Sequence, residues 1–97
     1  MNIEWSDQSR ADLTAIHAFI ARDSEFYADR MVQRIILRAE RILNHPLSGH
    51  LVHEYPEEIL KEVHEKPYRI IYRPSDSNVE IVTIIHFRQV LKKEKLP

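Results

Sequence analysis

Apolar residues in the first half of the chain recur at the three-to-four-residue spacing of amphipathic helices. Ser6 precedes the first such segment, which we expect to end near Arg22, and a serine in that position caps free helix amides. Ser24 stands in the same place before a second segment, which Asn44 and Pro46 end. Because only a few residues separate the segments, we predict an antiparallel helical hairpin. The apolar stripes are Leu13, Ile16 and Ile20 in the first helix and Met31, Val32, Ile35, Ile36, Ala39, Ile42 and Leu43 in the second.

Short runs rich in β-branched and aromatic residues predict strands at the start and in the second half of the chain. The run Val79–Phe87 is apolar on both faces, so we expect it in the centre of a sheet. The order β-α-α-β-β-β predicts one α+β domain over residues 1–97, with the helical hairpin on one face of a largely antiparallel sheet. The predicted strands are Met1–Trp5, Ile59–Glu65, Tyr68–Arg73 and Val79–Phe87, with a turn at Pro74–Asn78 and a loop at His45–Pro56.

Length and composition narrow the class of protein. A chain of 97 residues fits a single domain. It has 30% charged residues, no long apolar run and no charged leader, so we expect a cytoplasmic protein without a membrane segment. It has no cysteine, which excludes disulfides and thiolate chemistry. Gly49 is the only glycine, so no glycine-rich phosphate loop exists and no cofactor is expected.

Charge is balanced overall but uneven along the chain. Fourteen Lys and Arg face fifteen Asp and Glu, and a net charge of −1 does not indicate a nucleic-acid binder. Four arginines of the second helix, spaced by four, four and three, form one stripe. This stripe is either a docking face for an acidic partner or a solvated face near Asp29 and Glu40. The stripe is Arg30, Arg34, Arg38 and Arg41, and a second basic group, Arg88, Lys92, Lys93 and Lys95, lies in a tail that we expect to be a short helix or frayed.

Several motifs, in order, make the chain similar to the ParE/RelE superfamily of bacterial type II toxins. Trp5-Ser6 leads into Ala11–Leu13, and His45-Pro46 followed by Gly49-His50 resembles the family's helix end and turn. The strand Tyr68–Tyr72 matches its "YRI.Y" pattern closely. The remaining matches are Glu54, Lys61-Glu62, Ile81, Ile85, His86 and Arg88, and the departures are His50 and Lys61, where the family commonly has Arg.

The resemblance implies a toxin that a cognate antitoxin neutralises in a hetero-oligomer. RelE-like members cut mRNA on the ribosome, whereas ParE-like members inhibit DNA gyrase and lack the nuclease residues. The strand pattern "YRI.Y", with His86 and Arg88 resembling the family's terminal "H..R", is more like ParE. We therefore expect a non-enzymatic gyrase inhibitor, with a ribosome-dependent endoribonuclease as the alternative.

The alternative requires a base, an acid and a cation for the phosphate. Glu54 or Glu62, His86 and Arg69 are the residues that could supply them, and Arg73 lies on the same strand face as Arg69. The competing interpretation is that Glu62 and Arg69 pair across neighbouring strands while His86 is a hydrogen-bonded residue at a sheet edge.

Two further expectations concern ligands. His50 and His53 lie three apart in a Pro/Gly loop without the helix that makes a zinc motif specific, so we expect no metal. A protein or nucleic-acid target would meet basic and polar side chains of the second helix, the strands and the tail. These candidate partner-binding residues are Arg30, Arg34, Arg38, Arg41, Arg69, Arg73, His86, Arg88, Lys92 and Lys93.

Overall fold

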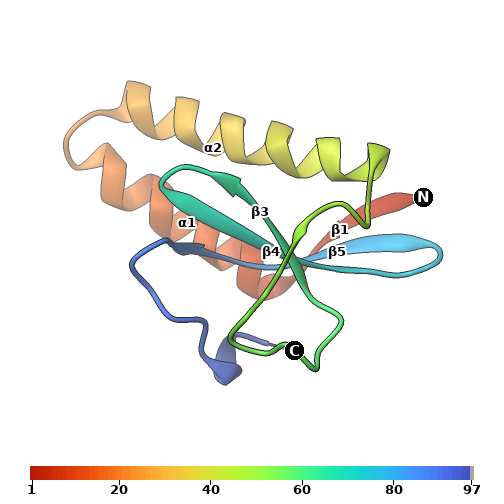
Figure 1. Ribbon diagram of the computed structural model, residues 1–97. Helices are drawn as coiled ribbons and strands as arrows, with labels where there is room; N and C mark the ends of the chain where they lie inside the picture. The colour runs from red at the N-terminus through yellow and green to blue at the C-terminus, as the bar shows by residue number, and fades with distance from the viewer. Residues whose placement is uncertain (97) are drawn as a thin grey trace.

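The computed structural model describes residues 1–96 and places two helices on one face of a five-stranded sheet (Figure 1). The strand order is β1-β5-β4-β3-β2, with β1 parallel to β5 and all other neighbours antiparallel. The predicted α+β class is confirmed, and β5 has a neighbour on both sides. The elements are β1 (Asn2–Trp5), α1 (Asp7–Ala21), α2 (Glu25–Glu40), η1 (Arg41–Asn44), β2 (His50–Leu51), β3 (Lys61–Glu65), β4 (Tyr68–Pro74), β5 (Asn78–His86) and η2 (Lys93–Lys95).

Both helices begin at the serines that the sequence indicates. The Ser6 hydroxyl accepts a hydrogen bond from the Ser9 amide at 3.0 Å, and the Ser24 hydroxyl accepts one from the Tyr27 amide at 3.2 Å. No helix within residues 1–96 has the length and apolar character needed to cross a bilayer. The main core joins the predicted stripes to the sheet through Leu13, Ile16, Met31, Ile35, Ala39, Ile42 and Leu43, whereas Val32 and Ile36 stay half-exposed beside it.

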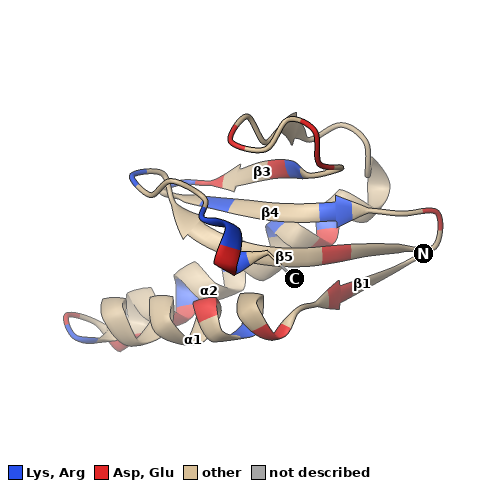
Figure 2. Ribbon diagram, turned by 90° about the horizontal axis from the view of Figure 1, so that it is seen from below, with Lys and Arg blue, Asp and Glu red and all other residues tan. Residues whose placement is uncertain are grey.

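The other face of the sheet has a core of its own, which corrects the expectation of a single covered face. Ile71 of β4 and Val82 and Ile85 of β5 are buried there. The loop after β2 covers them with Val52 and Leu60, and the C-terminal segment covers them with Leu91, which is 1% exposed. The tail is therefore packed against the sheet and not frayed. Figure 2 shows this segment lying beside β4 and β5.

Two strand boundaries also differ from the prediction. The loop at residues 45–56 contains the short strand β2, which pairs with β3. The strand predicted from Ile59 begins at Lys61, because Ile59 is exposed and Leu60 turns into the second core. Neither difference was readable from local periodicity, since both depend on contacts with distant segments.

A buried carboxylate completes the edge of β5 where β1 ends. β1 pairs with β5 only as far as Ile81, and α1 then lies along the open edge. Asp12 of α1 is 7% exposed and accepts hydrogen bonds from the Ile84 amide at 2.9 Å and from the Thr83 hydroxyl. Lys95 of the C-terminal segment contacts the same carboxylate at 3.1 Å. A side chain thus takes the place of a strand partner for this edge.

The single glycine allows a close approach between the β2 segment and β4. The Tyr72 hydroxyl accepts a hydrogen bond from the Gly49 amide at 3.2 Å and donates one to the Pro46 carbonyl at 2.8 Å. A Cβ atom at residue 49 would overlap this hydroxyl and lie 3.0 Å from the Glu62 carbonyl oxygen. The loop reaches the sheet here because residue 49 has no side chain.

We predict that Gly49→Ala lowers the free energy of unfolding by about 1–3 kcal/mol through this overlap. Tyr72→Phe removes the hydroxyl and costs about 1 kcal/mol alone. The loss in free energy of unfolding of the double variant, measured by urea unfolding, should be smaller than the summed losses of the two single variants, by about 0.5 kcal/mol or more. Additive losses would show that the Tyr72 hydroxyl is not what the new methyl group meets.

Candidate functional site

The buried polar group on the second face of the sheet is formed by Arg69, Glu54 and Glu62. Arg69 of β4 is 5% exposed and lies opposite His64 of β3 in the strand register. Glu62 is two residues before His64, so it projects from the same face of β3. Glu54 comes from the loop after β2. Three segments therefore converge on one guanidinium group.

All five N–H groups of Arg69 have acceptors. Its Nη2 lies 2.6 Å from Glu62 Oε1 and 2.8 Å from Glu54 Oε1. Its Nη1 lies 2.8 Å from Glu54 Oε2 and 3.4 Å from the Gln89 carbonyl oxygen. Its Nε is 3.2 Å from both carboxylate oxygens of Glu62. Arg69 has no free donor for a further ligand.

The electrostatics of the group favour the charged form of each member. Hydrogen bonds from Arg69 lower the pKa of Glu54 to about 2, against the opposing effect of burial. Burial disfavours the charged form of Glu62, but hydrogen bonds from Arg69 and His64 outweigh it and its pKa is lowered. The hydrogen bonds that Arg69 donates to Glu54 and Glu62 raise its own pKa. Two carboxylates and one guanidinium give the group a net charge of −1.

Glu54 also fixes the C-terminal segment. Its Oε2 accepts a hydrogen bond from the Leu91 amide at 2.9 Å, next to the buried Leu91 side chain. The Gln89 carbonyl meets Arg69 from the same segment. The group thus connects β3, β4, the loop after β2 and the C-terminal segment.

Histidines line the pocket of about 410 Å³ above this group. His64 Nε2 lies 2.5 Å from Glu62 Oε2, and its ring stacks on His50 with centroids 5.1 Å apart. Phe87 meets the His64 ring edge-on at 4.7 Å. The sequence analysis did not include His64, whose placement two residues after Glu62 on one strand face was the available signal. The exposed residues Arg88 and Val90 also line this pocket.

His86 lies apart from this group. It pairs with Tyr68 in the strand register, and the two rings meet edge-on at 5.7 Å. Tyr68 belongs to the core under the helices, whereas Arg69 faces the opposite side of the sheet. The His86 Nδ1 accepts a hydrogen bond from the Arg88 amide at 3.0 Å. The structure therefore brings Glu54, Glu62 and Arg69 together and places His86 on the other face.

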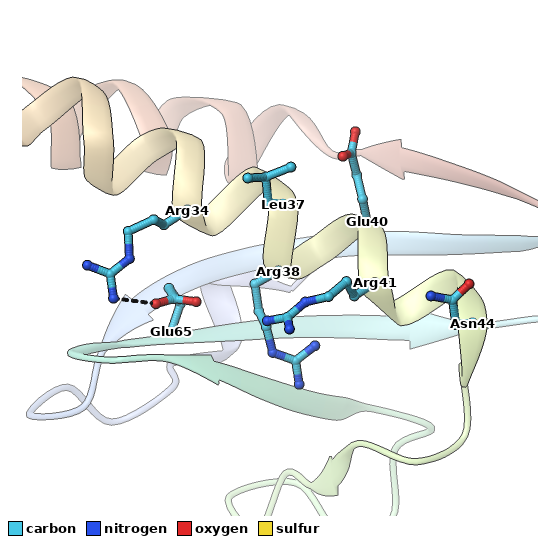
Figure 3. Close-up of a pocket in the computed structure, with 7 residues that line it drawn as sticks. All are labelled: Arg34, Leu37, Arg38, Glu40, Arg41, Asn44 and Glu65. Atoms are coloured by element: carbon cyan, nitrogen blue, oxygen red, sulfur yellow. Dashed lines mark hydrogen bonds and ion pairs between the residues drawn. The ribbon is translucent and has the colours of Figure 1, made fainter.

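The remaining candidate residues are dispersed over the surface. Arg73 is on the same face as Arg69 but contacts Glu80 at 3.3 Å instead. Arg30 lies over the Phe26 ring at 5.6 Å. Figure 2 shows Lys and Arg interspersed with Asp and Glu over both layers. Arg88, Lys92 and Lys93 are exposed in the C-terminal segment, and Arg34, Arg38 and Arg41 line a groove beside α2 (Figure 3).

Metal ligands do not converge in the described part of the chain. Within residues 1–96, no three His, Asp or Glu side chains are arranged to hold a metal ion. His53 is 86% exposed and lies 3.9 Å from Glu54, and His50 stacks on His64 instead of facing a shared centre.

The Glu54 interaction predicts a specific response to acid. A carboxyl whose pKa is lower in the folded than in the unfolded chain stabilises the fold above its unfolded pKa of 4.5. That contribution is lost as the pH falls from about 4.5 towards about 2. We predict that Glu54→Gln lowers the free energy of unfolding at pH 7 by about 1–3 kcal/mol and that the difference from the unsubstituted chain shrinks at pH 3.

Urea unfolding at pH 7 and pH 3 measures this difference. Glu57→Gln is the matched control because Glu57 is exposed in the same loop and forms no ion pair within residues 1–96. Equal acid sensitivity of the two variants would contradict the assignment of the effect to Glu54.

Comparison with known proteins identifies the family. The model of the family described as "ParE toxin of type II toxin-antitoxin system, parDE" matches residues 3–91. The chain is 34% identical over 84 residues to a Caulobacter vibrioides protein named Toxin RelE2, covering 87% of this chain and 92% of the relative. A solved structure titled "Chromosomal ParDE TA system from P. aeruginosa" shares the fold with a TM-score of 0.73 at 19% identity, covering 89% of this chain and 95% of that one. The chain belongs to the ParE toxin family of type II toxin–antitoxin systems.

Proposed function

We propose that this toxin arrests growth by binding and inhibiting DNA gyrase, without cutting RNA, and that a cognate antitoxin neutralises it in a hetero-oligomer. One observation carries the proposal. Arg69, the cation that RNA cleavage would need, has every N–H group bonded to the protein itself.

The charge of the site supports the same conclusion. RNA cleavage by 2′-hydroxyl attack needs a cation beside the phosphate, together with an acid and a base. The Arg69 group carries a net charge of −1, so it repels a phosphate. His86, the candidate acid, lies on the other face of the sheet against Tyr68. A non-enzymatic inhibitor needs none of this chemistry.

The surface of the helical hairpin supports a protein partner. Phe19, Phe26 and Tyr27 are 66%, 62% and 65% exposed around the turn between α1 and α2. Half-exposed Val32 and Ile36 line a groove of about 390 Å³ on the same hairpin. Exposed apolar surface of this kind is typical of interaction sites.

A RelE-like endoribonuclease is the second candidate. The 34% identical relative is named Toxin RelE2, and His50, His64 and Arg88 line the pocket above Glu62. In that case these residues, and not His86, would supply the acid, the base and the phosphate contact. The two candidates predict different first events in the cell.

We predict that inducing the chain without its antitoxin stops DNA synthesis before protein synthesis, with transcripts intact. Incorporation of labelled thymidine and methionine over the opening minutes, with mapping of mRNA ends, measures the order. His86→Ala should leave the arrest intact, and His64→Ala is the matched variant inside the pocket. Early loss of translation with cut transcripts, abolished by His64→Ala in a folded protein, would replace the gyrase proposal by the nuclease.

A further inference from the structure

A groove of about 510 Å³ runs between α2 and the β3–β4 side of the sheet (Figure 3). Arg38 of α2 and Arg41 of η1 project into it, and their guanidinium groups lie beside each other. Glu40 lines the groove, but its carboxylate points away from both. Leu37 is 53% exposed at the rim and also lines the neighbouring groove with Val32 and Ile36.

The structure divides the arginine stripe into members with and without a partner. Arg34 is bonded to Glu65 at 2.8 Å, and Arg30 lies over a phenylalanine ring outside the groove. Within residues 1–96, no carboxylate lies within 4.0 Å of the guanidinium group of Arg38 or Arg41. Burial and the like charge of Arg41 lower the pKa of Arg38, against the opposing effect of Glu65. Arg38 is half-buried and Arg41 is exposed, and neither forms an ion pair within residues 1–96.

Helix geometry explains only part of this arrangement. Cations near a helix C-terminus interact favourably with its dipole, by about 0.3–1 kcal/mol each. An arginine near the helix end gains this interaction whether its guanidinium group lies in the groove or in solvent. The interaction does not require two guanidinium groups to converge in one groove beside an exposed leucine.

We propose that Arg38 and Arg41 form a carboxylate-binding site for an acidic peptide segment of a partner protein, with Leu37 contacting an apolar residue beside the acidic one. Guanidinium groups bind carboxylates through paired hydrogen bonds, which a lysine cannot reproduce. The inference rests on the proposed function only in taking the antitoxin as the natural partner.

A peptide fits the groove better than a nucleic acid. Glu65 lines the groove and is already bonded to Arg34, so few cations are left for the successive phosphates of a nucleic acid. The whole chain has a net charge of −1, and the groove holds two guanidinium groups that form no ion pair within residues 1–96. A peptide carboxylate would meet the two arginines, and an apolar side chain next to it would contact Leu37.

The test measures peptide binding by fluorescence anisotropy with the full chain made by cell-free synthesis. The probe is a labelled 12-residue peptide made of four Glu-Leu-Glu repeats. Arg38→Gln/Arg41→Gln should weaken binding by about tenfold or more, because charge-assisted hydrogen bonds are lost. Arg38→Lys/Arg41→Lys should bind with intermediate affinity. The matched control Arg22→Gln/Arg30→Gln removes the same charge elsewhere on the hairpin and should bind like the unsubstituted chain.

Three results would overturn the proposal. Equal weakening by the control pair would mean diffuse charge attraction. A 12-nucleotide oligothymidylate that displaces the peptide and binds more tightly would mean a nucleic-acid surface. A melting temperature of the Arg38→Gln/Arg41→Gln variant clearly below that of the unsubstituted chain would mean that the pair serves the fold, whereas we expect it unchanged or raised. None of these measurements depends on toxicity, so their failure is distinct from failure of the gyrase proposal.

Discussion

The buried ion-pair group of Arg69, Glu54 and Glu62 determines how the second face of the sheet is closed. The segments that cover this face have little regular structure and bring few apolar residues, among them Leu60 and Leu91. Arg69 of β4 is bonded to Glu54 in the loop after β2, to the Gln89 carbonyl in the C-terminal segment and to Glu62 in β3. It therefore joins both covering segments to the sheet. Removing one member of such a buried group is destabilising because it leaves a buried charge without its partner, whereas replacing the whole group by apolar side chains is often neutral. The group therefore specifies where the loop and the C-terminal segment lie, more than it adds net stability.

The same constraint limits the chemistry available to the toxin. Glu54, Glu62 and Arg69 are the residue types that an RNA-cleaving site would use, and they are close together, but Arg69 donates its hydrogen bonds to the two carboxylates. The pocket above them is lined by histidines, apolar side chains and the exposed Arg88, and its floor is the ion-pair group with a net charge of −1. The surfaces that could bind a partner lie elsewhere. The helical hairpin has exposed aromatic residues, and Arg38 and Arg41 at its end form no ion pair within residues 1–96. These surfaces support the proposal that the toxin acts by binding a protein.

Local sequence signals predicted the parts of the fold that depend on local physics. The serine caps, the two apolar stripes and the order of helices and strands along the chain followed from spacing and residue type. The pairing of Glu62 with Arg69 was one of two interpretations that the sequence left open. The second core did not, because Val52, Leu60 and Leu91 lie in segments without periodicity and meet only through distant contacts. The position of His86 depends on the register between β4 and β5, where Val82 is an extra residue, and no sequence pattern revealed it.

The most direct test replaces the whole group at once, with Arg69→Met, Glu54→Gln and Glu62→Leu in one chain. Thermal unfolding followed by circular dichroism reports whether the fold survives, and induction in a bacterium without antitoxin reports growth arrest. We predict a cooperative unfolding transition and growth arrest equal to that of the unsubstituted chain, because the group positions segments and takes part in no reaction. A folded triple variant that no longer arrests growth would contradict this and would make the Arg69 group part of the toxic site.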